Sequence, residues 1–578
     1  MSKRLLSALF VLFLIPGFAL GESVRTGSHL ISTANPHASA AGAEMLAEGG
    51  SAVDAAIAAQ AVLSLVEPQS SGIGGGGFLL HYEKASGTIR AFDGRETAPK
   101  AVDERLFLDP DGKPLDFLEA ALGGRAVGTP GVLAMLWKAH QAHGKLPWAR
   151  LFEPAIRLAE EGFAISPRLH FLLVERAKLY RERGIGLDRL GPAGPYFFTD
   201  ALEAKPIGHI LKNPAYARTL RLIAAEGIEP FYEGEIARDM VATVAENGFG
   251  PGALALEDLA AYEARVGEPL CGTYRVWRLC SMGSPSSGGS TMLAILGLLE
   301  GFDMKAAGVM TAKSVHLFAE ASELAYADRD LYAADADFVA VRLESLFDKD
   351  YLAERRKLID PARAFGRGKA GTPPGITDTG FAPGAGPDGP STSHMVVVDG
   401  DGNVVSFTTT VQITFGSFLM TGGFFLNNQL TDFSFVPEKD GRKVANRVEP
   451  GKRPRSSMTP TIVLDADGRM RMAIGSPGGS RIISYVAKTL VGVLDWDLDI
   501  QSAIDLGNIV GRDGVLEIER GSNIVALIPE LAAMGHDARD RTLNSGLHGL
   551  VAAYDEDGTI AYYEGGADPR REGLVLGR

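Results

Sequence analysis

One hydroxyl residue, Thr392, stands at the position that most constrains this chain. It follows a tract rich in glycine and proline, residues 372–390, and precedes an apolar run, residues 395–398. This junction sets a loop beside a buried strand, which is the arrangement that a self-cleaving precursor requires. A cut between Ser391 and Thr392 would give the Thr392 hydroxyl its own α-amine as a base, and this activates a weak nucleophile. The sequence therefore predicts a precursor that cleaves itself before Thr392.

The first residues have the pattern of a secretory signal. Lys3 and Arg4 precede an apolar stretch, residues 5–18, that is too short to span a bilayer comfortably. The small residues Ala19 and Gly21 then form a cleavage site. We expect residues 1–21 to be removed and the protein to be exported, to the periplasm or the exterior. The alternative is an N-terminal membrane anchor, which the short apolar run disfavours.

Net charge bears on the binding partners, and the cysteine content bears on whether a disulfide can form. The formal net charge is −14, which argues against nucleic acid as a partner. The only two cysteines, Cys271 and Cys280, flank a segment rich in strand formers that could fold as a hairpin. Export would permit a disulfide between them, but two unpaired thiols are an equally open alternative.

Apolar periodicity predicts an α+β fold. Residues 39–48 and 53–65 have helical patterns separated by glycines, and most of residues 121–262 and 288–331 also have helical patterns. After Thr392, strand pairs flank turns rich in aspartate and glycine. The expected pairs are 395–398 with 404–410, 459–464 with 470–474, and 551–554 with 560–563. Helices 482–494 and 500–506 lie between them, so we expect sheets covered by helical layers.

Two glycine-rich segments have different interpretations. Residues 72–77 fit G-x-G-x-x-G, but a helix precedes and a strand follows, which is the reverse of a dinucleotide site. Close backbone approach in a crowded core is the better interpretation. Residues 475–481 lie between a strand and an apolar helix, where consecutive N–H groups can bind an oxyanion. The alternative is an ordinary turn.

Three polar segments could together bind a zwitterion. Residues 452–458 offer cations and hydroxyls, residues 427–432 offer amides and a carboxylate, and residues 93–96 offer a guanidinium. Taken singly, each is more typical of a solvated loop. Taken together, they could pair with the carboxylate and the ammonium of one ligand.

The ordered set of motifs resembles the γ-glutamyltransferases (γ-glutamyl transpeptidases, glutathione hydrolases), which are N-terminal-nucleophile hydrolases. The resemblance runs from about Thr33 to the C-terminus. The motifs that carry it are residues 49–56, 71–76, 95–99, 285–289, 392–394, 426–429, 452–458 and 475–479.

This resemblance implies a fold, a reaction and a site. The fold would be a four-layer αββα sandwich, built jointly by a large subunit, residues 22–391, and a small subunit, residues 392–578. The substrates would be glutathione and related γ-glutamyl compounds, with water or an amino acid or peptide as acceptor, and neither a cofactor nor a metal is needed. The implied catalytic residues are Thr392 as nucleophile, Thr410 beside it, and Gly478 and Gly479 as oxyanion donors. The implied binding residues are Arg95, Ser456 and Ser457 for the α-carboxylate, and Gln412, Gln429 and Asp432 for the α-amino group.

The chain departs from the family pattern at three places. Gln412 stands where many members have Asn, and Ser393 replaces a second Thr. The stretch between Asp432 and Ser456 is short and lacks Tyr, so we expect a reduced or absent lid. A cephalosporin or glutaryl amide acylase is an alternative function, because those relatives share the scaffold, and a precursor that binds without processing is another.

Overall fold

The computed structural model describes residues 23–340, 342–376, 380–384 and 391–578. The expected signal peptide and parts of the tract before Ser391 lie outside these residues. None of the helices in the described ranges has the length and apolar character needed to cross a membrane.

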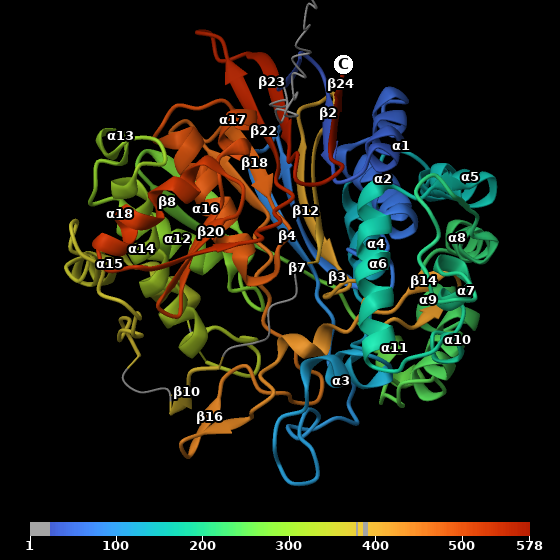
Figure 1. Ribbon diagram of the computed structural model, residues 1–578. Helices are drawn as coiled ribbons and strands as arrows, with labels where there is room; N and C mark the ends of the chain where they lie inside the picture. Colours follow the sequence, from blue (N-terminus) through green and yellow to red (C-terminus); the bar gives the residue numbers. More distant parts are fainter. Residues whose placement is uncertain (1–22, 341, 377–379, 385–390) are drawn as a thin grey trace, which may run out of the picture.

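Two seven-stranded antiparallel sheets form the centre of the molecule (Figure 1). The first sheet has the order β24 (Leu574–Gly577), β2 (Leu30–Thr33), β11 (Ser393–Val398), β12 (Val404–Thr410), β3 (Gly76–Glu83), β4 (Thr88–Gly94) and β7 (Arg265–Gly267). The second sheet has the order β1 (Val24–Thr26), β23 (Ile560–Ala567), β22 (His548–Tyr554), β18 (Met470–Gly475), β17 (Thr461–Leu464), β9 (Trp277–Ser281) and β8 (Leu270–Tyr274). Each sheet contains strands from before and from after the Ser391–Thr392 bond.

Strand β11 shows how the layers pack. Successive side chains of a strand point to opposite faces. Met395 and Val397 enter the core beneath the helices of the first sheet. Val396 and Val398 enter the core shared with the second sheet. Both faces of β11 are therefore buried, which explains its continuous apolar run.

Helices cover the outer face of each sheet (Figure 1). The first sheet is covered by α1 (Pro36–Ala47), α2 (Ala52–Val66) and α4 (Val132–His143), with α5 (Glu153–Glu161), α6 (Pro167–Glu182), α8 (Pro214–Glu226) and α10 (Glu235–Ala245) outside them. The second sheet is covered by α12 (Gly288–Leu299), α14 (Ala312–Tyr332), α16 (Ile482–Leu494) and α17 (Ile500–Asp505). The α+β prediction is confirmed.

Local sequence signals fix several boundaries. Helix α2 begins with a capping box, in which the Ser51 hydroxyl accepts from Asp54 N–H and the Asp54 carboxylate accepts from Ser51 N–H.

The expected hairpin at the cysteines is also present. Cys271 and Cys280 lie directly opposite each other on β8 and β9 and form a disulfide, so the question left open by the sequence is resolved.

The other elements are short. The remaining helices are α3 (Phe117–Ala121), α7 (Ala193–Phe197), α9 (Glu229–Tyr232), α11 (Leu256–Ala260), α13 (Met304–Ala307), α15 (Lys349–Arg356) and α18 (Ile528–Ala533). The remaining strands are β5 (Phe163–Ala164), β6 (Ile210–Leu211), β10 (Phe381–Ala382), β13 (Met420–Thr421), β14 (Phe424–Phe425), β15 (Glu438–Lys439), β16 (Arg442–Val444), β19 (Ile509–Arg512), β20 (Val515–Glu519) and β21 (Asp537–Arg541).

Candidate active site

The backbone at Thr392 is strained and firmly held. Its φ angle is +97°, a region that β-branched residues avoid and that costs roughly 1–3 kcal/mol. Thr392 N–H donates to Ser70 O at 3.1 Å. Arg571 Nη1 donates to Thr392 O at 2.7 Å. On the other side of the peptide bond, the Ser391 hydroxyl donates to Gln69 O at 2.6 Å.

The Thr392 hydroxyl is oriented by the neighbouring strand. It donates to the Thr410 hydroxyl at 3.1 Å. Thr410 Oγ also accepts from Gln412 N–H at 2.8 Å, which helps to fix its position. Both threonines are buried; Thr392 lies immediately before β11, and Thr410 is the last residue of β12.

The Ser391 carbonyl oxygen lies against the second glycine-rich turn. Gly478 N–H donates to it at 3.2 Å. Gly478 and Gly479 have φ angles of +136° and +62°, and a Cβ on Gly478 would lie 2.6 Å from the Tyr485 ring. Only glycine suits that position. The turn links β18 to a 3-10 helix, Gly479–Arg481, and then to α16, as the sequence pattern predicts.

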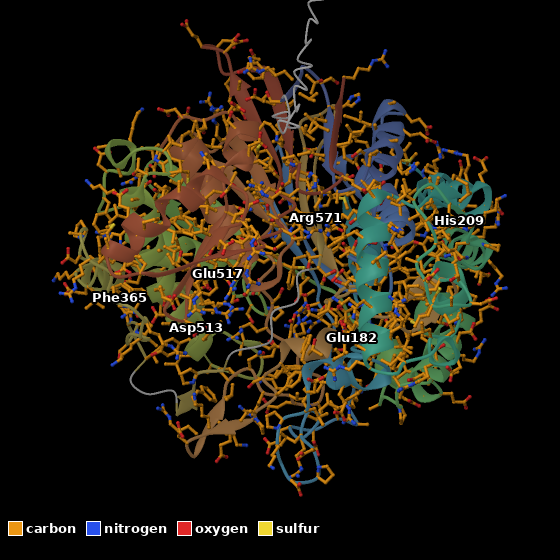
Figure 2. All side chains as sticks on the ribbon, in the orientation of Figure 1. Glu182, His209, Phe365, Asp513, Glu517 and Arg571 are labelled. Atoms are coloured by element: carbon orange, nitrogen blue, oxygen red, sulfur yellow. A yellow bond between two sulfur atoms is a disulfide. The ribbon has the colours of Figure 1, made fainter. Side chains whose placement is uncertain are left out.

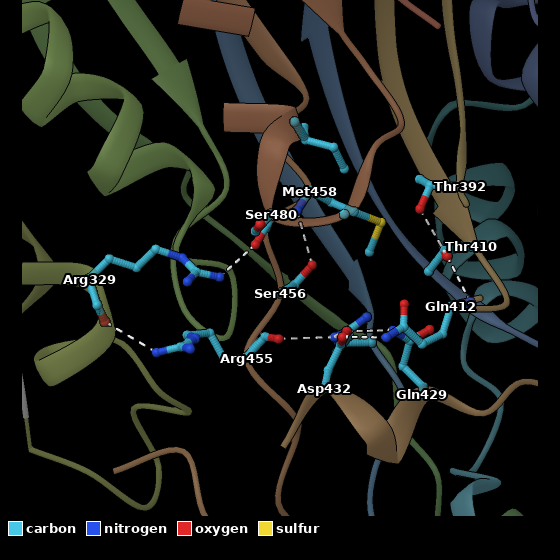
Figure 3. Close-up of a pocket in the computed structure, with 14 residues that line it drawn as sticks. Arg329, Thr392, Thr410, Gln412, Gln429, Asp432, Arg455, Ser456, Met458 and Ser480 are labelled. Atoms are coloured by element: carbon cyan, nitrogen blue, oxygen red, sulfur yellow. Dashed lines mark hydrogen bonds and ion pairs between the residues drawn. The ribbon is translucent and has the colours of Figure 1, made fainter. Parts of the chain in front are cut away.

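A pocket opens beside Thr392 and Thr410 (Figure 3). Nine of the ten residues expected at the site line it, and the tenth, Gly478, adjoins the lining residue Gly479. The lining residues are Arg95, Arg329, Thr392, Thr410, Gln412, Gln429, Asp432, Arg455, Ser456, Ser457, Met458, Gly479, Ser480 and Ile482.

Asp432 is the carboxylate at the centre of the polar wall of the pocket, by which we mean Arg95, Gln412, Gln429 and Asp432. Gln412 Nε2 donates to Oδ1 and Gln429 Nε2 donates to Oδ2, both at 2.7 Å. Arg95 Nη2 pairs with the same carboxylate. The Asp432 side chain is 20% exposed, whereas Arg95 is 1% exposed, so Asp432 is the member of the pair that faces the pocket.

Arg95 is held rigidly by its surroundings. Its Nε donates to Pro454 O at 3.0 Å and its Nη2 to Arg455 O at 3.2 Å. The buried carboxyl of Glu96 lies 3.7 Å from Arg95 Nη1. Burial raises the pKa of Glu96 to about 8, although Arg95 opposes the shift. Glu96 therefore remains mostly protonated at neutral pH, and Asp432 is the anion that faces Arg95.

The segment that carries Ser456 and Ser457 is hydrogen-bonded to the residue that precedes α12. The Ser287 hydroxyl donates to Ser456 O at 2.6 Å. Arg329, from α14, donates from Nη2 to Ser457 Oγ at 2.7 Å and from Nε to Ser287 Oγ at 2.9 Å. These bonds help to explain why residues 452–458, apart from the partly exposed Ser457, are buried and do not form the solvated loop that they suggest when taken singly.

The first glycine-rich segment packs as the sequence predicts. A Cβ on Gly75 would lie 2.0 Å from Thr410 O, and one on Gly76 would lie 2.3 Å from Glu96 Oε2. A side chain at position 75 would displace the strand that carries Thr410, and one at position 76 would displace Glu96. The glycines thus allow the backbone of this segment to pack closely against Thr410 and Glu96, and they do not form a nucleotide-binding loop.

Sequence reasoning missed four charged residues near the site. Arg329 and Arg455 line the pocket, and burial lowers the pKa of Arg455 to about 9. Arg571 lies near the centre of the molecule (Figure 2), and burial likewise lowers its pKa to about 9. Burial raises the pKa of Glu67, which lies in the same buried region as Arg571. Arg455 belongs to a noted motif, but nothing in the sequence singles out the other three.

Apart from Arg455, the segment expected to be a reduced lid contributes no lining residue to the pocket, although Asn446 Nδ2 donates to Asp432 O at 2.7 Å. Its residues 438–444 form β15 and β16, which pair with β10 in a separate small sheet. None of the described residues 433–454 lines the pocket.

Comparisons place the chain among known proteins. A family model described as Gamma-glutamyltranspeptidase matches residues 38–577. The glutathione hydrolase proenzyme of Bacillus subtilis (strain 168) is 35% identical over 556 residues, covering 95% of this chain and 91% of that protein. The acylase ACY 1 proenzyme of Pseudomonas sp. (strain V22) is 35% identical over 561 residues, covering 94% and 93%. The crystal structure of cephalosporin acylase from Bacillus halodurans matches with a TM-score of 0.84 and 26% identity, covering 99% of both chains.

Proposed function

Because this chain belongs to the gamma-glutamyltranspeptidase family, we propose that it is a self-processing γ-glutamyl acyltransferase and hydrolase. It would cleave the γ-glutamyl amide of glutathione and related compounds through an ester on Thr392. The acyl group would then pass to water or to an amino acid or peptide acceptor.

Maturation would begin at the Ser391 carbonyl. The Thr392 hydroxyl attacks this carbon, and Gly478 N–H stabilises the oxygen as it gains charge. The C–N bond breaks, the Thr392 nitrogen takes the proton, and Ser391 becomes an ester on Thr392 Oγ. Water then hydrolyses the ester, releasing a Ser391 carboxylate and a free Thr392. The strained φ angle at Thr392 favours this step because cleavage removes the constraint.

The same groups would serve the substrate. After cleavage the Thr392 α-amine stays close to Ser70 O and acts as base for the hydroxyl beside it. Thr410 orients that hydroxyl, and the N–H groups of Gly478 and Gly479 receive the oxyanion of the γ-carbonyl. The polar wall would hold the amino acid head of the donor.

The observation that carries the γ-glutamyl assignment is the Asp432 carboxylate. It faces the pocket and is fixed by three donors on its inner side. A donor ammonium would pair with it, while Arg95, Ser456 and Ser457 bind the donor α-carboxylate. A glutaryl group has no ammonium and would leave Asp432 without a cationic partner from the substrate.

The two products would stay together and act outside the cytoplasm. Residues 22–391 and 392–578 each contribute strands to both sheets, which supports an N-terminal-nucleophile hydrolase formed jointly by two subunits. We propose removal of residues 1–21 and export on the sequence pattern given above.

Glutaryl or cephalosporin acylase activity is a second candidate. Two observations favour it: the similarity to an acylase proenzyme and a cephalosporin acylase structure, and a pocket that residues 433–454 leave uncovered. An uncovered pocket accommodates bulky leaving groups whichever acyl group is bound.

Anilides that differ only in the acyl head distinguish the two candidates. We expect kcat/KM for γ-glutamyl anilide to exceed that for glutaryl anilide by about 10²-fold or more, because a glutaryl group offers no ammonium to pair with Asp432 in the pocket. Small and bulky γ-glutamyl amides should be cleaved at similar rates. Equal or greater activity on the glutaryl anilide would instead establish the acylase.

A further inference from the structure

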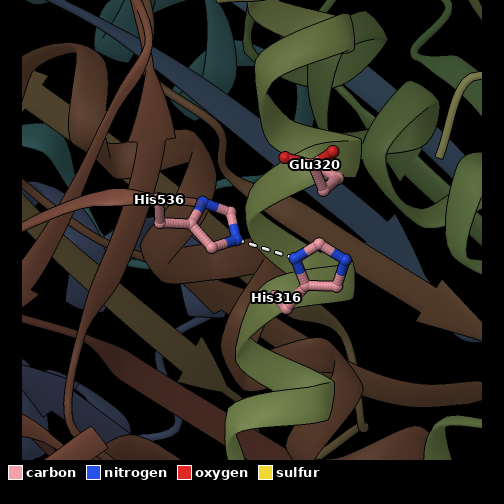
Figure 4. A group of neighbouring side chains, drawn as sticks. All are labelled: His316, Glu320 and His536. Atoms are coloured by element: carbon pink, nitrogen blue, oxygen red, sulfur yellow. Dashed lines mark hydrogen bonds between the residues drawn. The ribbon is translucent and has the colours of Figure 1, made fainter. Parts of the chain in front are cut away.

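Two histidines and a glutamate converge in the helical layer over the second sheet, apart from the pocket residues (Figure 4). His316 and Glu320 lie four residues apart on α14 and therefore share one face of the helix. His536 lies just before β21. One ligand atom from each residue lies within 4.8 Å of the other two.

The histidine tautomers are defined by the contacts around them. His316 Nε2 lies 2.8 Å from Asp360 O, which can only accept, so Nε2 carries the proton. His316 Nδ1 therefore accepts a hydrogen bond from His536 Nε2–H, 2.7 Å away. Metal binding would move this His536 proton to Nδ1 of the same ring, so that both facing nitrogens present lone pairs. An imidazole whose far nitrogen donates to a carbonyl is the usual form of a metal-binding histidine.

The third group, Glu320, is buried beside the two neutral imidazoles. The Glu320 side chain is anchored by Phe365 N–H, which donates to Oε2 at 3.1 Å. His316 and Glu320 are buried. Burial lowers the pKa of His316 and lowers that of His536 to about 4, so both rings are neutral at neutral pH. Burial raises the pKa of Glu320 to about 7, and a bound cation would displace its proton.

We propose that His316, Glu320 and His536 form a site for a divalent metal of the zinc type. Two imidazoles and one carboxylate are a common ligand set for Zn²⁺, with a fourth position for water. Two nitrogens bound to one zinc lie roughly 3.3 Å apart, so the histidine pair must open by about 0.6 Å. His536 can accommodate this movement because it is only partly buried and lies in the turn after α18.

The site would join two parts of the chain. His316 and Glu320 precede the Ser391–Thr392 bond, and His536 follows it. A metal bound here would link α14 to the C-terminal product, apart from the strands that already hold the sheets together. Its role would be structural, because none of its ligands lines the pocket beside Thr392.

Metal binding by the purified protein tests the proposal. The protein, without a polyhistidine tag, is stripped with chelator and titrated with Zn²⁺ alone, and Co²⁺ serves as a spectroscopic probe. We expect one Zn²⁺ per processed precursor, that is per pair of large and small chains, together with a tetrahedral Co²⁺ spectrum and a melting temperature raised by a few degrees. Mg²⁺, which prefers oxygen ligands, should have no effect.

Matched variants locate the metal. His536→Ala and Glu320→Gln should each weaken Zn²⁺ binding at least about tenfold, since each removes one ligand. Glu320→Gln retains an acceptor for Phe365 N–H and so guards against misfolding. His209→Ala, an exposed histidine at the edge of the molecule (Figure 2), should bind like the wild type. Absence of Zn²⁺ binding by the wild type, or wild-type affinity in both ligand variants, would overturn the proposal.

Discussion

The amide nitrogen of Gly478 lies 3.2 Å from the carbonyl oxygen of Ser391. This contact places an oxyanion donor on the bond that Thr392 would cleave. The same turn adjoins the pocket where a substrate carbonyl would sit. One pair of glycines can therefore assist both self-cleavage and substrate turnover, provided that the new Thr392 terminus stays in place.

Replacing Asp432 by Asn tests the head-group assignment. The amide keeps the shape but loses the charge that meets a substrate ammonium. We expect kcat/KM for γ-glutamyl anilide to fall by about 10²–10⁴-fold, with a much smaller change for glutaryl anilide. Asp440→Asn, an exposed position in the same segment, is the matched control. An equal loss of kcat/KM on both substrates would show that Asp432 does not recognise the substrate ammonium.

Arg95→Lys keeps the charge but removes the planar fork. The guanidinium contacts Asp432, Pro454 O and Arg455 O at once, which an ammonium cannot reproduce. We expect donor binding to weaken by roughly 2–5 kcal/mol, measured as kcat/KM for γ-glutamyl anilide. Arg105→Lys, on the surface, is the control. Unchanged kinetics in the Arg95 variant would contradict its role.

Gly75→Ala should disturb the strand that carries Thr410. The new Cβ would lie 2.0 Å from Thr410 O, so the backbone must move. We expect a destabilisation of about 1–3 kcal/mol or more and slower appearance of the two chains on a denaturing gel. Gly267→Ala has open space around its Cβ and should behave as wild type. Normal stability and processing of the Gly75 variant would show that the contact is unimportant.

Glu96 should make stability depend on pH. The folded protein keeps the Glu96 proton up to a pKa of about 8, whereas the unfolded chain releases it near 4.5. The folded state therefore binds more protons in this window, and its contribution to the free energy of unfolding falls as pH rises from 4.5 to about 8. Glu96→Gln cannot titrate and should lose this part of the slope.

The measurement is urea unfolding across this pH window. The uncleaved Thr392→Ala background keeps the reaction unimolecular. Glu556→Gln, an exposed glutamate in a hairpin turn, is the control. Identical pH slopes for the Thr392→Ala protein with and without Glu96→Gln would refute the assignment.

The sequence predicted much of the fold because local signals agreed with burial. Helix α2 has a capping box, and the Asp-Gly turns flank strands whose apolar pattern matches two buried faces. It could not predict the sheet order, because β2 pairs with β11 on one side and with β24 on the other through contacts made across most of the chain length. The cysteine pair depended on the register of one hairpin, which alternation alone does not determine.

The candidate site was predicted where its residues belong to recognisable motifs. Nine expected residues line one pocket, but Arg329 was missed because it lies within a long helix with no local motif. Arg571 was missed because its contact with Thr392 O joins residues 179 positions apart. The metal-binding proposal also depends on a distant residue, since His536 meets α14 only in the folded chain.

The most direct test of the account is the N-terminal sequence and intact mass of each chain in the purified protein. We predict two chains, the smaller beginning at Thr392, with Thr392→Ala remaining a single uncut chain. After brief exposure to a γ-glutamyl donor, the small chain should carry one γ-glutamyl group on Thr392. A small chain that begins elsewhere, or a Thr392→Ala variant that still yields the same two chains, would contradict the claim that Thr392 cuts the precursor and then carries the acyl group.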